Sequence, residues 1–171
     1  MNVESFNIDG WEEQRTGLIL AENEEWLLVK NIPVDYTLDG FTVYKKSFIS
    51  NRINGGEERL LEKVFTLKGV KPQIPDEIEF TDTIGFLKWS EQKFGLFEFQ
   101  DEDNEALSYG KINKIIGNKL IIDFIDSKGN VEEAFDYEFA IDQIRCITFS
   151  TDYFEAIRLL YLDKLASKPA P

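Results

Sequence analysis

Histidine is absent from this 171-residue sequence, and its absence excludes several kinds of active site. Ser-His-Asp and Cys-His nucleophiles need an imidazole, and so do many general bases that work near neutral pH. Most zinc and iron sites also use histidine ligands. We therefore expect no catalytic residue, no metal ligand and no cofactor-binding residue.

Cysteine is nearly as scarce, because Cys146 is the only one. A single cysteine forms no intramolecular disulfide, so nothing indicates an oxidising compartment. Cys146 lies in the apolar run 144–149, which predicts a small buried hydrophobic side chain. Without a histidine to activate its thiol, it is a poor candidate nucleophile.

Long apolar segments are also missing. The first 14 residues are acidic and mixed with polar residues, so they lack the basic and apolar regions of a signal peptide. No apolar run approaches the about 20 residues that a membrane span needs. We therefore expect no membrane association, and a cytoplasmic location by elimination.

Basic residues are outnumbered, with 19 Lys and Arg against 32 Asp and Glu and a net charge of −13. Both halves are acidic and no basic stripe offsets the charge, so the protein should repel phosphate backbones. We expect no tight binding of duplex DNA or generic RNA at physiological salt. The simplest interpretation of the acidity is that it keeps the protein soluble.

An internal repeat is the main positive feature. A shift of 93 residues aligns the segment 15–19 with 108–112 and the apolar segment 27–29 with 120–122. The same shift pairs Arg52 with Arg145 and Val64 with Ile157. A slip of one or two residues is expected near Asp35 and Lys128, where turns interrupt the pattern. The repeat predicts two copies of one module.

Each half has the pattern of short strands followed by a helix, with glycine or Asn-Gly turns between strands. The predicted strands are 16–21, 25–32, 41–45 and 48–53 in the first half, and 94–100, 107–116, 120–125, 131–139 and 144–149 in the second. The predicted helices are 57–66, 84–93 and 153–165.

Short, bent antiparallel strands of this kind are typical of small barrels. The spacing, with Gly17 and Gly110 inside long strands, resembles the Sm-like or SH3-like fold, and the two-module arrangement is similar to uncharacterised bacterial proteins with tandem Sm-like or SH3-like modules. The resemblance implies a mainly β, α+β fold with a first barrel at 1–67, a Pro-containing connector at 68–80, a second barrel at 81–165 and a flexible tail at 166–171. It supplies no catalytic residues and no Sm RNA-binding signature.

Buried positions follow from the matched apolar segments. We expect the following side chains to lie in the core: Leu28, Val29, Ile121, Ile122, Ile147 and Leu160. Trp26 lies in an apolar strand and belongs with them.

Candidate partner-binding residues are few. Trp11 and Trp89 lie among polar residues, where tryptophan could serve as an exposed interface anchor or pack against the neighbouring module. Tyr44, Lys45 and Lys46 form the one local basic segment beside an aromatic residue. A solvated strand end explains that segment better than a binding role does.

Three functional hypotheses remain. The first is a non-catalytic protein-binding or scaffolding module, including an acidic inhibitor or immunity-type binder of a basic protein. The second is a nucleic-acid-binding Sm-like protein, which rests on fold analogy alone. The third is a histidine-independent carboxylate enzyme, although no pair among the many carboxylates stands out.

Overall fold

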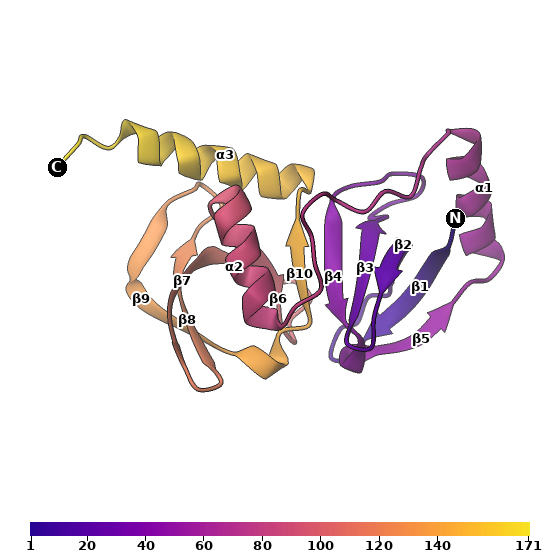
Figure 1. Cartoon of the computed structure of the whole chain (residues 1–171), viewed down its shortest axis with the longest axis horizontal. Coiled ribbons are helices and arrows are strands. Elements are labelled where there is room, and N and C mark those ends of the chain that lie inside the picture. The colour runs from indigo at the N-terminus through magenta and orange to yellow at the C-terminus, as the bar shows by residue number, and fades with distance from the viewer.

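The computed structural model describes the backbone of all 171 residues and every side chain except those of residues 133–136. The chain is mainly antiparallel sheet with three helices, an α+β fold (Figure 1). The first half contains β1 (Val3–Ile8), β2 (Arg15–Glu22), β3 (Trp26–Asn31), β4 (Phe41–Lys45), β5 (Ile49–Ile53) and α1 (Gly56–Leu67). The second contains α2 (Thr83–Phe94), β6 (Phe97–Gln100), β7 (Ser108–Ile116), β8 (Lys119–Ile125), β9 (Val131–Ala140), β10 (Cys146–Phe149) and α3 (Asp152–Ser167).

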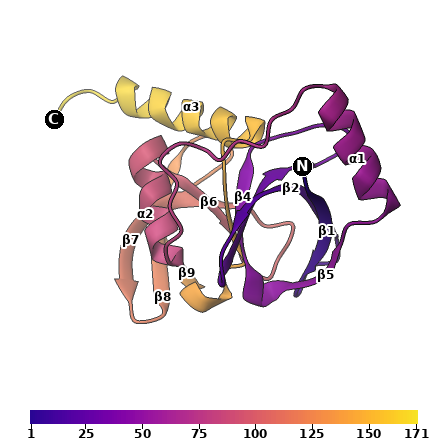
Figure 2. The ribbon, with the colours of Figure 1, turned by 45° about the vertical axis from the view of Figure 1, so that its right-hand side comes forward.

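The ten strands form one sheet in the order β5-β1-β2-β3-β4-β10-β6-β7-β8-β9. Each half contributes five neighbouring strands, and its last strand lies beside its first. Antiparallel pairing of β4 with β10 joins the halves. The strands curve strongly within each half, but the hydrogen-bonded order is open at β5 and β9 (Figure 2). One sheet therefore runs through both halves and is not closed on itself.

The register of the strands repeats between the halves. The first half pairs Gly17 with Asn31 and Ile19 with Val29, and the second pairs Gly110 with Phe124 and Ile112 with Ile122. All four positions are 93 residues from their counterparts. The register slips immediately after Ile19 and again after Ile112. An irregularity at the same place in both halves agrees with the predicted shift through these strands.

The shift does not stay at 93 along the whole half. Leu27 pairs with Tyr44 and Leu120 with Phe139, so β4 and β9 are related by 95 residues. The N-caps of α1 and α3, Gly55 and Thr151, are 96 residues apart. The predicted matches of Arg52 with Arg145 and Val64 with Ile157 are therefore out of step, because the halves differ in length after their third strand.

Gly17 and Gly110 occupy positions where the neighbouring strand leaves no room for a side chain. A Cβ at Gly17 would lie 2.8 Å from Val29 Cβ, and one at Gly110 would lie 2.6 Å from the Asp123 carbonyl oxygen. Close backbone approach is a common reason for glycine inside a strand. These two residues allow the long β2 and β7 strands to pair closely with β3 and β8.

The largest core cluster crosses the boundary between the halves. Trp26, Leu28 and Val43 from the first half pack with Phe99 and Ile147 from the second. The second cluster lies in the first half but includes Cys146. Shared burial of this kind makes the halves depend on one another for stability.

Most of the predicted core is confirmed. Leu28, Val29, Ile121, Ile122 and Ile147 are buried, as are Trp26 and Cys146. Leu160 is the exception, with 45% of its surface exposed. On α3 the buried positions are Phe154, Ile157 and Tyr161, and Leu160 lies on the solvent side of that stripe.

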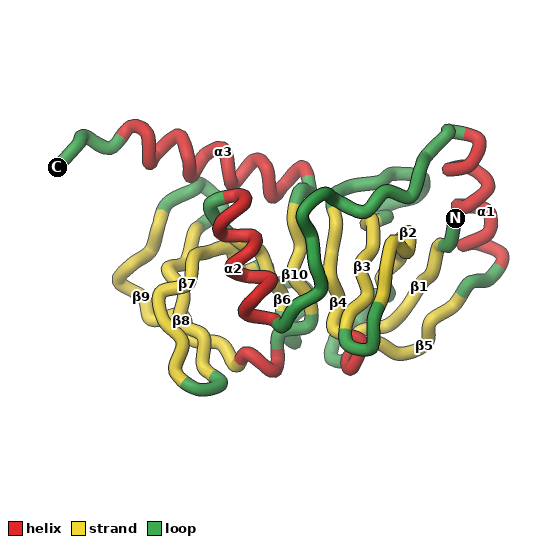
Figure 3. The backbone as a smooth tube through the Cα atoms, viewed as in Figure 1, coloured by secondary structure: helices red, strands yellow, loops and turns green.

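The helices cover different parts of the sheet. α1 packs on β1 at one end of the molecule, whereas α2 covers the curved second half and α3 runs along its top edge in the view of Figure 1. A long loop joins α1 to α2 and crosses the region where the halves meet (Figure 3). Over the described residues, no helix combines the length and apolar character required to traverse a bilayer.

Candidate functional site: a polar cleft where the halves meet

The three strands at the junction have one apolar face and one polar face. Val43, Ile147 and Phe99 belong to the large core on one side of β4, β10 and β6. Side chains alternate along a strand, so the residues between them point to the opposite side. Thr148 is paired with both Thr42 and Glu98, which places these three polar residues in one row across the sheet.

A second row runs parallel to the first. Cys146 is paired with Tyr44 on one side and with Gln100 on the other. All three side chains are buried. Burial raises the pKa of the Cys146 thiol to about 12, with the nearby Glu98 charge adding to the effect. The thiol therefore stays protonated at neutral pH and is a poor nucleophile.

Except for Cys146, the residues of these two rows line the floor of a cleft of about 480 Å³. Its walls come from both halves, namely the start of β2, the loop after β3 and the loop after β6. The charged residues that line it are Glu13, Arg15, Asp39, Glu98 and Glu105. Four acidic groups against one basic group make the cleft a favourable place for a positive charge.

Glu98 is the unusual member of the cleft. It is only 3% exposed, and the Tyr109 hydroxyl donates a hydrogen bond to its Oε2. Burial raises the pKa of Glu98 to about 7, the Tyr109 hydrogen bond opposes the rise, and the charge of Asp39 adds to it. Among the described side chains, no donor contacts its other oxygen, Oε1. Arg15 does not supply one, because its guanidinium contacts Glu13 at 3.4 Å and lies over the Trp11 ring at 4.8 Å.

The remaining floor residues bond mainly to one another. The hydroxyls of Thr42 and Thr148 share a 2.8 Å hydrogen bond across the β4–β10 pair. The Gln100 side-chain amide donates to the Asn104 carbonyl oxygen at 2.9 Å. The Gln100 Oε1 accepts from the Cys146 thiol at 3.9 Å and keeps one lone pair. With the hydroxyl lone pairs, the floor is therefore richer in acceptors than in donors.

Trp11 is not an exposed anchor. Its side chain is 8% exposed and packs edge-on against Tyr44. The indole Nε1 donates to the Asp101 carbonyl oxygen at 2.7 Å, across the boundary between the halves. Trp11 therefore helps hold the halves together beside the cleft, as packing against the neighbouring module would require.

Trp89 lies on the other side of the sheet, away from the polar rows. It is partly buried and meets Phe149 edge-on at 4.9 Å between ring centroids. Phe94 also contacts it edge-on, and the Lys93 ammonium lies 5.5 Å from the ring centroid. The structure thus does not bring Trp89 together with Trp11, and most of the Trp89 ring packs on the core.

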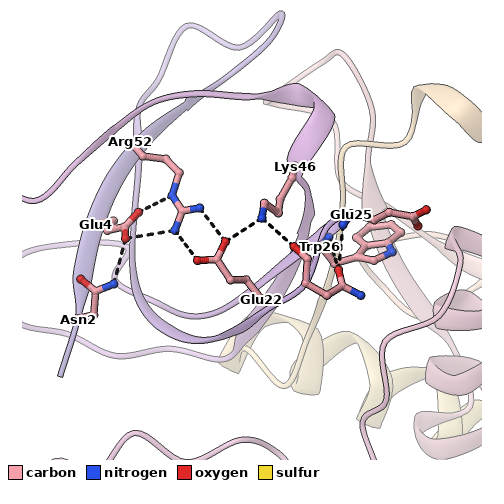
Figure 4. Close-up of polar contacts among 8 residues, drawn as sticks. Asn2, Glu4, Glu22, Glu25, Trp26, Lys46 and Arg52 are labelled. Carbon is pink, nitrogen blue, oxygen red and sulfur yellow. Dashed lines mark hydrogen bonds and ion pairs between the residues drawn. The ribbon is translucent and has the colours of Figure 1, made fainter.

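In the basic segment at the end of β4, Lys46 is paired with an acid of the first half (Figure 4). Tyr44 is buried, Lys45 is partly exposed, and Lys46 Nζ contacts Glu22 at 2.9 Å. Arg52 also contacts Glu22, at 2.8 Å. These two partners lower the pKa of Glu22 to about 2, with Arg52 the larger cause. Lys46 is therefore already paired with an acid of its own chain.

Other candidate ligand positions have local explanations. Glu58 accepts a 2.8 Å hydrogen bond from the Gly55 N–H and occupies the N-terminus of α1, where an anion would bind. In the acidic turn at 101–105, Asp101 and Asp103 accept backbone hydrogen bonds from the turn itself. Among the described side chains, no group of three or more Cys, Asp and Glu residues is arranged to hold a metal ion.

Sequence reasoning missed Glu98 as a site residue. The segment 97–100, Phe-Glu-Phe-Gln, alternates apolar and polar side chains, which is typical of a half-exposed strand. In the structure all four residues are buried, so the polar side of this strand faces a cleft and not open solvent. The alternation was visible in the sequence, but part of the wall that encloses Glu98 comes from the distant first half.

Known proteins give no indication of the function of this chain. No family model matches the chain, and neither the curated proteins nor the solved structures contain a significant match.

Proposed function

We propose that the chain is a non-catalytic protein-binding or scaffolding module, and that its partner binds in the cleft between the halves. The observation that carries this proposal is a single concave surface lined by both halves, with four acidic groups and one arginine. Small-molecule pockets are predominantly apolar with a few polar groups. This cleft is mainly polar, which favours a charged segment of a protein.

The proposal includes the architecture. We infer that the chain consists of two tandem Sm-like or SH3-like small β-barrel modules that arose by duplication. Each half has the same strand order, and β2–β3 and β7–β8 share their register and their irregularity. The glycines at Gly17 and Gly110 support the same inference, because each permits close approach of the next strand. Duplication places two such modules side by side, and the cleft lies where they meet.

The acidity of the cleft favours a basic partner. The net charge of −13 attracts cationic proteins over a distance and speeds their encounter. An inhibitor or immunity-type role, in which the chain neutralises a basic protein, fits this charge. The same charge disfavours nucleic acid as the occupant of the cleft.

One observation favours a second candidate function, a histidine-independent carboxylate enzyme. Glu98 has a pKa raised to about 7 and lines a cleft, which suits a general acid or base. Loss of substrate turnover in Glu98→Gln would support this alternative over the binding role.

The test is affinity purification from native lysate with two charge-matched variants. Glu13→Lys with Glu105→Lys reverses the charge on the rim of the cleft, and Glu24→Lys with Asp163→Lys makes the same change elsewhere on the surface. A partner retained by the native chain and by the second variant, but lost from the first, is the expected result. Equal retention by both variants would show that the cleft is not the binding site.

A further inference from the structure

The buried carboxyl group of Glu98 has an incomplete set of hydrogen bonds. Its Oε2 accepts from Tyr109, and the described side chains offer no donor to Oε1. Over the described residues, Trp26 Nε1 is the one fully enclosed side-chain nitrogen or oxygen without a partner, so Glu98 Oε1 is not sealed from the cleft. Because Glu98 lines the cleft, a donor from a bound ligand can reach this oxygen.

The surroundings of Glu98 define the chemistry of that donor. Thr148 and Gln100 flank Glu98 on the floor, and each presents an oxygen with unused acceptor capacity. The charged groups on the walls are Glu13, Asp39 and Glu105, with Arg15 held by Glu13 and Trp11. A ligand that fits must therefore be cationic, donate several hydrogen bonds and enter from the open side of the cleft.

We propose that the cleft binds an arginine side chain of the partner protein, with Glu98 as its buried counter-ion. This inference rests on the proposed function and names the group that the partner inserts. A guanidinium group carries five N–H donors in a planar fork and is less strongly hydrated than an ammonium group. It can bond to the carboxylate and to neighbouring oxygens at once, whereas a lysine offers a single point of charge.

Binding of this kind is coupled to proton release. The titratable groups that face Glu98 include Tyr109, Tyr44 and Cys146, and their pKa values are all raised, so these groups stay neutral between pH 6 and pH 8. Glu98 itself binds a proton near neutral pH and must lose it to pair with a cation. An arginine therefore binds more tightly as the pH rises.

The experiment is an NMR titration of the isotopically labelled full chain at constant ionic strength. The probes are N-acetyl-arginine methylamide, its lysine analogue and its citrulline analogue, which has nearly the shape of arginine without the charge. We expect shifts centred on β4, β10 and β6, with arginine the tightest probe and citrulline the weakest. The apparent affinity for arginine should increase about tenfold between pH 6 and pH 8, as the group with its pKa near 7 loses its proton.

The matched variants are Glu98→Gln, which keeps the shape of the side chain, and Glu24→Gln, an exposed change outside the cleft. Glu98→Gln should weaken arginine binding about tenfold or more, since a hydrogen bond to a charged group is replaced by one to a neutral group. Glu24→Gln should leave it unchanged. Equal binding of arginine by both variants, or equal binding of arginine and citrulline, overturns the inference.

Two further outcomes separate this inference from the proposed function. If the rim charge reversal abolishes partner capture but arginine does not bind, the cleft binds a protein through other groups and the inference fails alone. If arginine binds but the rim charge reversal leaves partner capture intact, the proposed function fails and the cleft is a site for small cations. A spermidine titration distinguishes that case, because tighter binding of spermidine than of the arginine probe would assign the site to free polyamines.

Discussion

The two halves place a carboxyl group at the same point of the sheet in different ways. In the first half, Ser5 is paired with Thr16, and 93 residues later Glu98 is paired with Tyr109. Ser5 donates a 2.6 Å hydrogen bond to Glu58, which reaches the sheet from α1. In the second half the carboxyl group is on the strand itself.

The balance between burial and hydrogen bonds differs at these two carboxyl groups. Glu58 accepts from the Ser5 hydroxyl and from the Gly55 N–H, and these bonds lower its pKa, with that from Ser5 the largest cause. Glu98 accepts from Tyr109 alone, and its burial raises the pKa. At Glu58 the hydrogen bonds outweigh burial, whereas at Glu98 burial outweighs the one hydrogen bond, so the two pKa values shift in opposite directions.

The position of the closing helix differs between the two halves. α1 packs on β1, and its Phe65 meets Val3, on the same face as Ser5. α3 follows β10 and packs Phe154 and Ile157 into the large core, and its Tyr153 and Phe154 rings meet Tyr109, the residue bonded to Glu98. The cleft beside Glu98 is bounded by loops of both halves and by Thr151, the N-cap of α3.

The largest expected effect on stability comes from truncating an equivalent core residue in each half. Phe6 and Phe99 are 93 residues apart and neither is exposed. Each substitution, Phe6→Ala or Phe99→Ala, should lower the free energy of unfolding by about 3–5 kcal/mol. The core clusters include residues from both halves, so we expect each variant to unfold in one transition, measured by urea denaturation with fluorescence and circular dichroism. Two separate transitions, with only one affected by each variant, would show that the halves are independent.

Much of the fold was predictable from the sequence, because its strands have alternating or fully apolar patterns bounded by turn residues. The strand at 41–45 matches its predicted bounds, and the three predicted helices lie within one or two residues of α1, α2 and α3. β1 was missed, since Glu4 and Asn7 interrupt its apolar residues and the segment was interpreted only as a polar N-terminus. The single sheet was not predictable, because the pairing of β4 with β10 joins segments about a hundred residues apart.

The site was less predictable than the fold. Trp11 and Trp89 were proposed as anchors from their polar neighbours in the sequence, but contacts far along the chain decide their burial. Glu98 is enclosed by Asp39 and Arg15 from the other half, which no local pattern places beside it. Local alternation predicts which side of a strand a residue faces, and only the tertiary fold decides what covers that side.

The two carboxyl groups should make the free energy of unfolding depend on pH in opposite directions. Glu98 should give the larger effect. Below about pH 4.5, Glu98 is protonated in both the folded and the unfolded chain. Between that pH and about 7, the unfolded chain ionises while the folded chain keeps its proton, so stability falls as the pH rises. The total loss should be about 3 kcal/mol, at 1.36 kcal/mol for each pKa unit.

Glu98→Gln removes this loss, so the variant should become more stable than the native chain above pH 7. Urea midpoints between pH 4.5 and pH 8 measure the difference, with Glu24→Gln as an exposed control. Parallel curves for the native chain and Glu98→Gln would mean that Glu98 is ionised in the folded protein and that another group compensates its charge.

Glu58 should show a smaller effect of opposite sign. Its pKa is lowered in the folded chain, so its ionised form stabilises the fold above the unfolded value, and this contribution is lost as the pH falls through the folded value. At pH 7, Glu58→Gln should lower the free energy of unfolding by about 1–2 kcal/mol, because the hydrogen bonds from Ser5 and Gly55 then meet a neutral group. The gap between the variant and the native chain should close on acidification toward pH 3, in the same urea experiment. A gap that widens with acid would mean that the Ser5 hydroxyl does not favour the charged carboxylate, and the contrast between the halves would then depend on burial alone.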